Sequence, residues 1–188
     1  MNTKNNLRFQ ATEELIKENF IKLLREKEIN KISISELCKM CSINRTTFYL
    51  HYTDIYDLME KLDQEMSEKM VSLFTEKASS IGDGFVKLFY YILEYRDFYY
   101  GCFRDNTRPG IIRIALPDAV KNSVKSVSSR MGYGTEKELL YHQEFFKAGI
   151  TALIHLWLFS GCEETPEEMA EIINREYNPN KNPFSQSP

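Results

Sequence analysis

Hydrophobic residues recur at helical spacing in the first part of the chain. In residues 12–27 the apolar positions lie three or four apart and are separated by charged positions, which predicts an amphipathic helix. The apolar positions are Leu15, Ile16, Phe20, Leu23 and Leu24. Residues 29–32 break the pattern, so we expect the helix to end near Lys27.

Two short helices are predicted next. Ser33 and Glu36 have the spacing of a capping box, in which a serine and a glutamate side chain bond free N–H groups at a helix start. This helix is expected to end before a turn at residues 42–44, whose last residue, Asn44, is a second N-cap candidate. The helix that follows is expected to reach His51.

A long fourth helix is predicted after Asp54, which can cap it. Its apolar stripe consists of Ile55, Leu58, Met59, Leu62, Met66, Met70, Leu73 and Phe74. Residues 79–84 are rich in Gly, Ser and Asp and predict a linker. A helix is expected after it, from Phe85 to about Tyr100.

The rest of the chain predicts breaks at residues 106–110 and 131–135, a largely apolar helix at 136–160, and a loose tail at 178–188. Residues 165–168 open a last helix with a cap, a first-turn proline and two acids that suit the helix dipole. No segment shows the alternation of a strand. The predicted fold is therefore all-α.

Charge is unevenly distributed along the chain. The net charge is −3, but residues 1–52 contain nine Lys and Arg against six Glu, and the remainder is acidic. A basic segment attracts phosphates while an acidic body is repelled by them, which favours a nucleic-acid partner.

Several other classes are disfavoured by the sequence. The longest apolar run, residues 152–159, is far shorter than the roughly 20 residues that span a membrane. The polar N-terminus lacks a secretory h-region, and four cysteines at irregular spacing suit a reducing compartment, so a cytoplasmic protein is expected. No nucleophile and base pairing, carboxylate pair or glycine-rich phosphate loop indicates an enzyme, and no cofactor is expected.

The second short helix carries side chains suited to DNA. Two short helices joined by three residues match a helix-turn-helix, whose second helix enters the major groove. Arg45 can donate two hydrogen bonds to a guanine edge and Leu50 can contact a thymine methyl, while Tyr49 and His51 are expected to contact phosphates. The expected DNA contacts are Ser33, Asn44, Arg45, Thr46, Thr47, Tyr49, Leu50 and His51.

Residues 32–58, ISISELCKMCSINRTTFYLHYTDIYDL, resemble the signature of the TetR family of bacterial transcriptional regulators, with Thr47-Phe48-Tyr49-x-His51-Tyr52 at its core. Three positions depart from the family pattern. A glycine after the first helix is absent, the turn glycine is Ser42, and a common phosphate-binding lysine is Ile55. Only the change at Ile55 bears on function, because it concerns one phosphate contact.

The resemblance implies a DNA-binding domain at residues 1–53 and a helical regulatory and dimerisation domain at 54–177. Aromatic residues of the second domain are candidates for an effector pocket, with core packing as the alternative. These candidates are Phe89, Tyr95, Tyr99 and Phe146. A further apolar set packs either internally or, as we prefer, across a dimer interface that forms a four-helix bundle. Its members are Phe145, Leu153, Ile154, Trp157, Met169, Ile172 and Ile173.

Other residues with metal or redox chemistry are expected to be structural. Cys38 and Cys41 form a C-x-x-C within one short helix with no second pair, which favours core thiols over a zinc or redox site. His142 and His155 are single helical histidines and favour core or interface positions over metal ligation.

The helix pair and the family resemblance together imply a homodimeric repressor that binds a palindromic operator in double-stranded DNA and, by the mechanism of the family, is released by a small-molecule effector. The alternatives are a DNA-binding regulator without a ligand and a helical interaction module. An effector would release the operator by shifting the long fourth helix.

Overall fold

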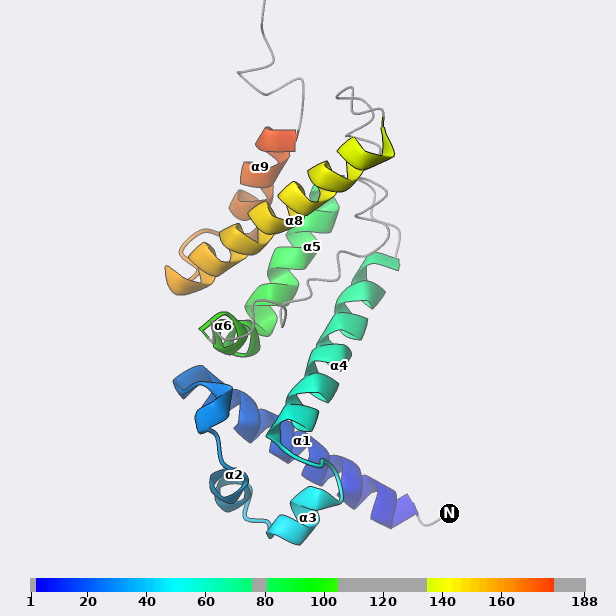
Figure 1. Cartoon of the computed structure of the whole chain (residues 1–188), viewed down its shortest axis with the longest axis vertical. Coiled ribbons are helices and arrows are strands. Elements are labelled where there is room, and N and C mark those ends of the chain that lie inside the picture. Colours follow the sequence, from blue (N-terminus) through cyan, green and yellow to red (C-terminus); the bar gives the residue numbers. More distant parts are fainter. Residues whose placement is uncertain (1–2, 76–80, 105–134, 178–188) are drawn as a thin grey trace, which may run out of the picture. The chain divides into compact units, whose positions relative to one another are not determined.

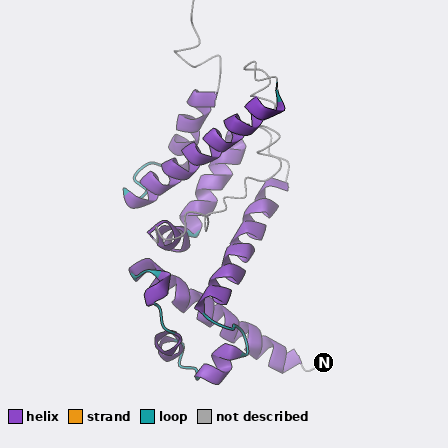
Figure 2. Cartoon of the chain, viewed as in Figure 1, coloured by secondary structure: helices purple, strands orange, loops and turns teal. Residues whose placement is uncertain are grey.

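The computed structural model describes residues 3–75, 81–104 and 135–177, and every regular element in these ranges is a helix (Figures 1 and 2). This confirms the all-α fold. The helices are α1 Thr3–Glu26, the 3-10 turn η1 Ile29–Lys31, α2 Ile34–Met40, α3 Arg45–Tyr49, α4 Ile55–Thr75, α5 Ile81–Glu94, α6 Arg96–Arg104, α8 Glu136–Phe159 and α9 Pro166–Tyr177. Within the described ranges, no helix is long and apolar enough to cross a membrane.

The chain divides into two compact units. Unit 1 comprises Met1–Met66 and Asp97–Ile112, and unit 2 comprises Ser67–Arg96 and Arg113–Pro188. Helix α4 therefore contributes its first half to unit 1 and its second half to unit 2, and α6 lies almost entirely in unit 1.

Helix α1 supplies the apolar base of unit 1. Ile16, Phe20, Leu23 and Leu24 are all buried, as the helical spacing predicts. The helix begins at Thr3, however, well before the predicted start near Thr12. Residues 6–10 are exposed and mostly polar, and Phe9 continues the apolar side of the helix by a single residue. Without a proline or glycine to stop it, the helix continues toward the N-terminus, because each added residue gains a hydrogen bond.

A partly buried ion cluster joins α1 to α4 inside unit 1. The Lys17 Nζ lies 2.6 Å from Glu65, 3.1 Å from Glu14 and 3.6 Å from Glu13, and the lysine side chain is 12% exposed. Burial lowers the pKa of Lys17, but the hydrogen bonds and charges of Glu65 and Glu14 outweigh it and hold the pKa above its ordinary value. The lysine is therefore charged, and it draws the first half of α4 toward α1.

Helix α6 docks on the C-terminal end of α1. Arg25 pairs with Asp97 at 3.0 Å, and the Arg104 guanidinium donates to the Arg25 carbonyl at 2.9 Å. Gly101 approaches α1 so closely that a Cβ added there would lie 2.7 Å from the Leu24 side chain and 2.8 Å from the Leu24 carbonyl oxygen. This contact requires glycine because any larger residue would separate the helices.

The predicted helix from Phe85 to Tyr100 is two helices, broken at Tyr95. The segment contains no glycine or proline at the break that could have indicated it. Packing decides the break, since α5 buries its apolar face in unit 2 whereas α6 belongs to unit 1 from Asp97 onward.

Helices α5, α8 and α9 pack together in unit 2. Helix α5 packs against α9, and its rings meet α8, with Phe85 and Phe146 at 6.0 Å and Phe89 edge-on to Trp157 at 5.3 Å. The Trp157 indole donates to the Glu164 carbonyl at 2.9 Å, which ties the end of α8 to the loop before α9. The ring contacts and the hydrogen bond of the Trp157 indole thus fix how these helices pack against one another.

The helix starts in unit 2 follow local capping rules. Thr165 and Glu168 exchange hydrogen bonds at 2.8 and 3.2 Å, so α9 begins where the sequence predicts. Thr135 and Glu138 cap α8 in the same manner. The predicted linker at residues 79–84 is wrong for 81–84, because α5 begins at Ile81 and its first turn tolerates the glycine and favours the acid. The predicted breaks at 106–110 and 131–134 and the tail at 178–188 lie outside the described residues.

Replacing Gly101 with alanine should destabilise the protein by about 1–3 kcal/mol, because the new methyl meets the Leu24 backbone, which cannot turn away. Urea unfolding followed by circular dichroism measures this change. An unchanged midpoint would show that α6 does not need its close approach to α1.

Candidate nucleic-acid interface

Ser33 caps the start of helix α2, and its hydroxyl accepts the Glu36 N–H at 3.2 Å. The capping box is only half formed, because the Glu36 carboxylate is paired with the Lys27 ammonium, which contacts both of its oxygens. A charged partner binds a carboxylate more strongly than a neutral amide does. Lys27 thereby links the end of α1 to the start of α2.

The turn between α2 and α3 requires a left-handed residue, and Ser42 occupies that position with φ of 53°. The Ile43 N–H donates to the Cys38 carbonyl at 3.0 Å, and the Ser42 N–H donates to the Lys39 carbonyl at 3.2 Å. This is the bonding pattern of a Schellman motif, which closes a helix and reverses the chain direction. A serine there bears the steric cost that a glycine avoids.

Asn44 caps α3, as predicted. Its side-chain oxygen accepts the Thr47 N–H at 2.7 Å and the Thr47 hydroxyl at 3.0 Å. The Thr47 hydroxyl is therefore committed to the cap. The amide group of Asn44 makes no hydrogen bond in the described part of the chain and can donate outward.

Two buried aromatic residues anchor the inner side of helix α3. Phe48 and Tyr52 are almost completely buried, and their ring centroids lie 5.8 Å apart. With this side fixed, Arg45 and Thr46 are exposed, and so are Tyr49 at 53% and Leu50 at 69%. Four of the eight predicted contacts thus share the outer side of one short helix.

The side chain of Arg45 does not extend freely into solvent. Its guanidinium donates to the hydroxyl of Ser35 on α2, and both groups lie at the surface. This bond orders the arginine across the outer surface of the helix pair. The sequence interpretation missed Ser35, which no motif marks.

The end of α3 is tied to α4 by polar contacts. The Lys61 ammonium donates to the His51 carbonyl at 3.2 Å and to Asp57 at 3.1 Å. The Thr53 N–H, donating to Asp57 at 2.8 Å, lowers the pKa of that carboxyl, and Lys61 lowers it further. Asp54 accepts the N–H groups of Tyr56 and Asp57 at 2.8 Å each, so it caps α4 as predicted.

His51 is half-buried and lies against α1. Its imidazole stacks on the Phe9 ring with centroids 3.8 Å apart and planes 26° apart. Phe9 lies outside the predicted helix, so its role was missed. Its spacing of seven residues from Ile16 continues the apolar side of α1 and could have indicated it.

Positions with other chemistry are part of the core. Ile55 is buried, so the residue that replaces the family's lysine has an apolar packing role. Cys38 and Cys41 are buried thiols whose pKa is raised by burial. Among the described residues, no group of three His, Cys, Asp or Glu could hold a metal ion.

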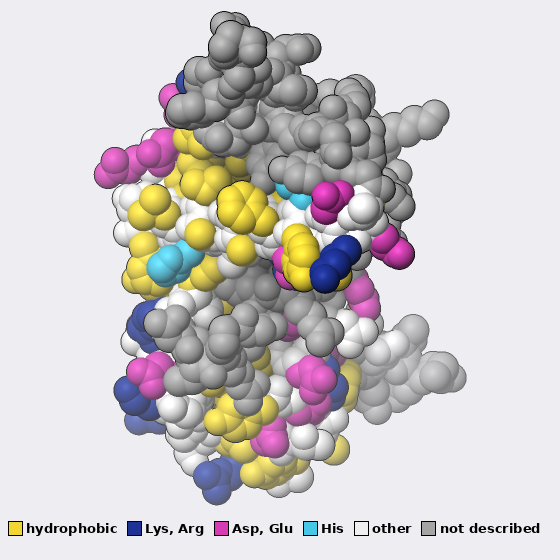
Figure 3. Space-filling model, turned by 45° about the horizontal axis from the view of Figure 1, so that its top comes forward, with side chains coloured by type: hydrophobic (Ala, Val, Ile, Leu, Met, Phe, Trp, Pro, Cys, Tyr) yellow, Lys and Arg dark blue, Asp and Glu magenta, His cyan; other side chains and the backbone are white. Residues whose placement is uncertain are grey.

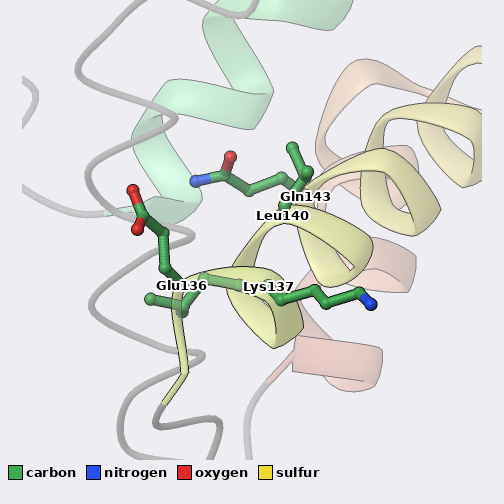
Figure 4. Close-up of a pocket in the computed structure, with 5 residues that line it drawn as sticks. Glu136, Lys137, Leu140 and Gln143 are labelled. Carbon is green, nitrogen blue, oxygen red and sulfur yellow. The ribbon is translucent and has the colours of Figure 1, made fainter.

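The four predicted effector contacts have different immediate neighbours. Phe89 packs on Trp157, and Phe146 packs on Phe85. The ring centroids of Tyr95 and Tyr91 lie 4.8 Å apart, and Tyr99 belongs to unit 1. A hollow beside the first two turns of α8 involves none of them (Figure 4). It is lined by Glu136, Lys137, Leu139, Leu140 and Gln143.

The predicted dimer residues separate into interior and exterior sets. Ile154, Trp157, Met169 and Ile173 are buried within unit 2, so they cannot form an outer surface. Phe145 is 76% exposed and Ile172 40%, while Leu153 is intermediate. Hydrophobic side chains run along the exposed side of α8 (Figure 3). The exposed members are Leu140, Tyr141, Phe145, Leu156 and Phe159.

Replacing Ser42 with glycine should stabilise the protein by about 0.5–1 kcal/mol, because glycine adopts a positive φ without steric cost. Ser42→Ala is the matched control and should leave stability nearly unchanged, since alanine has the same Cβ. Thermal unfolding compares the three proteins. Equal stability of the glycine and alanine variants would show that the turn is not strained.

The chain has clear similarity to known proteins. Residues 79–178 match a family model described as a TetR-type transcriptional regulator C-terminal region. No curated protein sequence matches the chain significantly. A solved structure, the dihydroxyacetone kinase operon activator DhaS, has a similar fold with a TM-score of 0.62 and 16% identity over 88% of this chain and 93% of that one. The family match spans more than half of the chain, and it marks a regulator and not an enzyme. The chain therefore belongs to the TetR family of transcriptional regulators.

Proposed function

We propose that the protein is a homodimeric repressor that binds a palindromic DNA operator through α3 and is released by a small-molecule effector. Residues 1–53 form the DNA-binding domain in this proposal, and residues 54–177 form the regulatory and dimerisation domain. The observation that carries it is the anchored helix α3, with Phe48 buried below and Arg45, Thr46, Tyr49 and Leu50 exposed above.

Each exposed side chain of α3 has chemistry that suits a groove. Arg45 can leave Ser35 for a guanine edge, since one exposed hydrogen bond to a hydroxyl is then exchanged for two to the guanine O6 and N7. Leu50 offers an apolar contact for a thymine methyl. Thr46 offers a hydroxyl that can bond to the edge of a base in the groove. These residues would read the bases.

Phosphate contacts would surround this reading surface. The Tyr49 hydroxyl, the Asn44 amide and the His51 imidazole can each donate to a phosphate oxygen. Ser33 lies at the start of α2, where backbone N–H groups favour an anion. Thr47 has a smaller role than the sequence indicated, because its hydroxyl is bonded to Asn44.

The dimer would form through the exposed apolar surface of α8 and α9. We define this surface as Tyr141, Phe145, Leu156, Phe159 and Ile172, all of which are exposed in the single chain. A row of large apolar residues on one side of a helix is costly in water and is typical of an interface. A two-fold pairing of this surface would present two α3 helices to the two halves of a palindrome.

Repression needs only occupancy of the operator, so it is the simplest outcome of binding. The structural neighbour DhaS is named as an operon activator, however, and an activator is therefore our second candidate. A repressor and an activator differ in the effect of the bound dimer on RNA polymerase. This effect depends on the position of the operator and not on the DNA-binding surface.

Control by an effector would act through unit 2. A ligand has to favour the arrangement that does not bind DNA, and a coupling of ~1–3 kcal/mol changes affinity about 5- to 150-fold. Phe89 and Phe146 lie in packed ring contacts, so a ligand reaching them has to separate those rings. We expect this separation of the rings to move α4, which runs through both units.

Selection of bound sequences from random duplex DNA should enrich a palindrome, and Arg45→Ala with Tyr49→Phe should abolish the enrichment. Arg45→Ala alone should weaken binding to the selected site by about 10- to 100-fold, because a bidentate guanine contact is lost. Arg175→Ala in unit 2 removes the same charge and is the control. No enriched site at low salt from a folded dimer would refute DNA reading by α3, and an enriched site would serve for effector screening.

Replacing Phe145 with aspartate should convert the dimer to a monomer, because a buried charge opposes pairing of the α8 surface. Light scattering after size exclusion should give twice the 22.1 kDa chain mass for the wild type and one chain for the variant. Leu7→Asp, at a similarly exposed apolar position in α1, should remain dimeric. Operator affinity should fall by at least about 100-fold in the monomer, because the two heads no longer bind together. A dimeric Phe145 variant would place the interface elsewhere.

A further inference from the structure

Phe9 lies far from the helix-turn-helix in sequence, but its ring covers one side of the His51 imidazole. The centroid separation of 3.8 Å and the angle of 26° describe a nearly parallel stack. Phe9 itself is 42% exposed, so the pair lies at the surface of unit 1 and not in the core. Such a pair does little for the core and instead fixes the plane of the imidazole.

The two nitrogens of His51 have different surroundings. Nδ1 is buried and has no hydrogen-bond partner in the described part of the chain. Nε2 is not among the buried unpaired atoms and accepts or donates no hydrogen bond there. Nε2 is thus the nitrogen that an external group can reach.

This asymmetry selects a protonation state. A proton on Nδ1 would be a buried donor without an acceptor, which is costly, whereas an unprotonated Nδ1 costs less. Burial lowers the pKa of His51, and the Glu13 carboxylate opposes this by favouring the charged ring. Lys61 of α4 lies near the same residue, where its ammonium donates to the His51 carbonyl. The ring is therefore neutral near pH 7, with its proton on Nε2.

We propose that Phe9 is a positioning residue of the DNA-binding surface, whose ring holds the His51 imidazole so that it offers one N–H donor, at Nε2, to a DNA phosphate as a neutral group. The inference rests on the proposed function only for the identity of the acceptor. The orientation of the ring is a property of the free protein.

The free protein tests the orientation first. The chain has three histidines, so proton NMR gives three imidazole signals, and His51→Gln identifies the one from residue 51. In the wild type this signal should titrate below the ordinary histidine value of about 6.5. In Phe9→Ala the titration should move up toward that value, because Nδ1 becomes solvated. Phe9→Tyr should restore the wild-type titration, and Leu7→Ala, a truncation two residues earlier, should not change it.

DNA binding tests the consequence. At pH 8, Phe9→Ala should weaken operator binding about 3- to 10-fold, because a freely rotating neutral ring loses its oriented donor. At pH 6 the loss should be smaller, since the solvated ring gains a proton and makes a charge-assisted contact. The wild type and Phe9→Tyr should show less dependence on pH in this range. Circular dichroism confirms that each variant is folded.

The two failures can be distinguished. If His51 titrates identically in the wild type and in Phe9→Ala, the positioning role is wrong, whatever the DNA result. If the titration shifts as expected but His51→Gln binds the operator as tightly as the wild type, then the phosphate contact of the proposed function is wrong. A uniform loss of affinity at pH 6 and pH 8 in Phe9→Ala would also overturn the proposal, because it would indicate a general distortion of α3.

Discussion

The burial of Phe48 and Tyr52 is the contact on which the proposed DNA-binding surface depends. Helix α3 has five residues and could not persist alone, because a helix of that length does not recover the cost of its first turn. Two buried aromatic rings that pack against each other supply the missing free energy. Every exposed side chain of α3 takes its direction from this anchor, since the residues opposite Phe48 have to face solvent.

Polar contacts then fix the surroundings of the anchored helix. The turn at Ser42 sets the entry of α3, and Lys61 holds its exit by bonding the His51 carbonyl. Lys17 and Glu65 join the same stretch of α4 to α1. Helix α4 therefore contacts both the segment that ends α3 and helix α1 within unit 1. A displacement of its first half would strain two sets of charged hydrogen bonds, which are the costly ones to break. This arrangement gives α4 the physical means to influence α3.

The two sides of helix α8 in unit 2 have different surroundings. The inner side of α8 places Phe146 and Trp157 against the rings of α5, and its outer side presents Phe145 and Leu156 to solvent. Neighbouring residues in the sequence thus have opposite roles, because adjacent helical positions point about 100° apart. An apolar helix on both sides is typical of one that packs within its own chain and against a second chain.

The sequence by itself determined the helical class and the caps at Ser33, Asn44 and Asp54. These features depend on hydrogen bonds and spacing within a few residues, so the local sequence contains the information. Only the tertiary structure decided which side of α8 is interior, where α5 ends, and that Phe9 covers His51. Each of these depends on groups distant in the chain meeting in space, and no periodicity within a single helix specifies its partner.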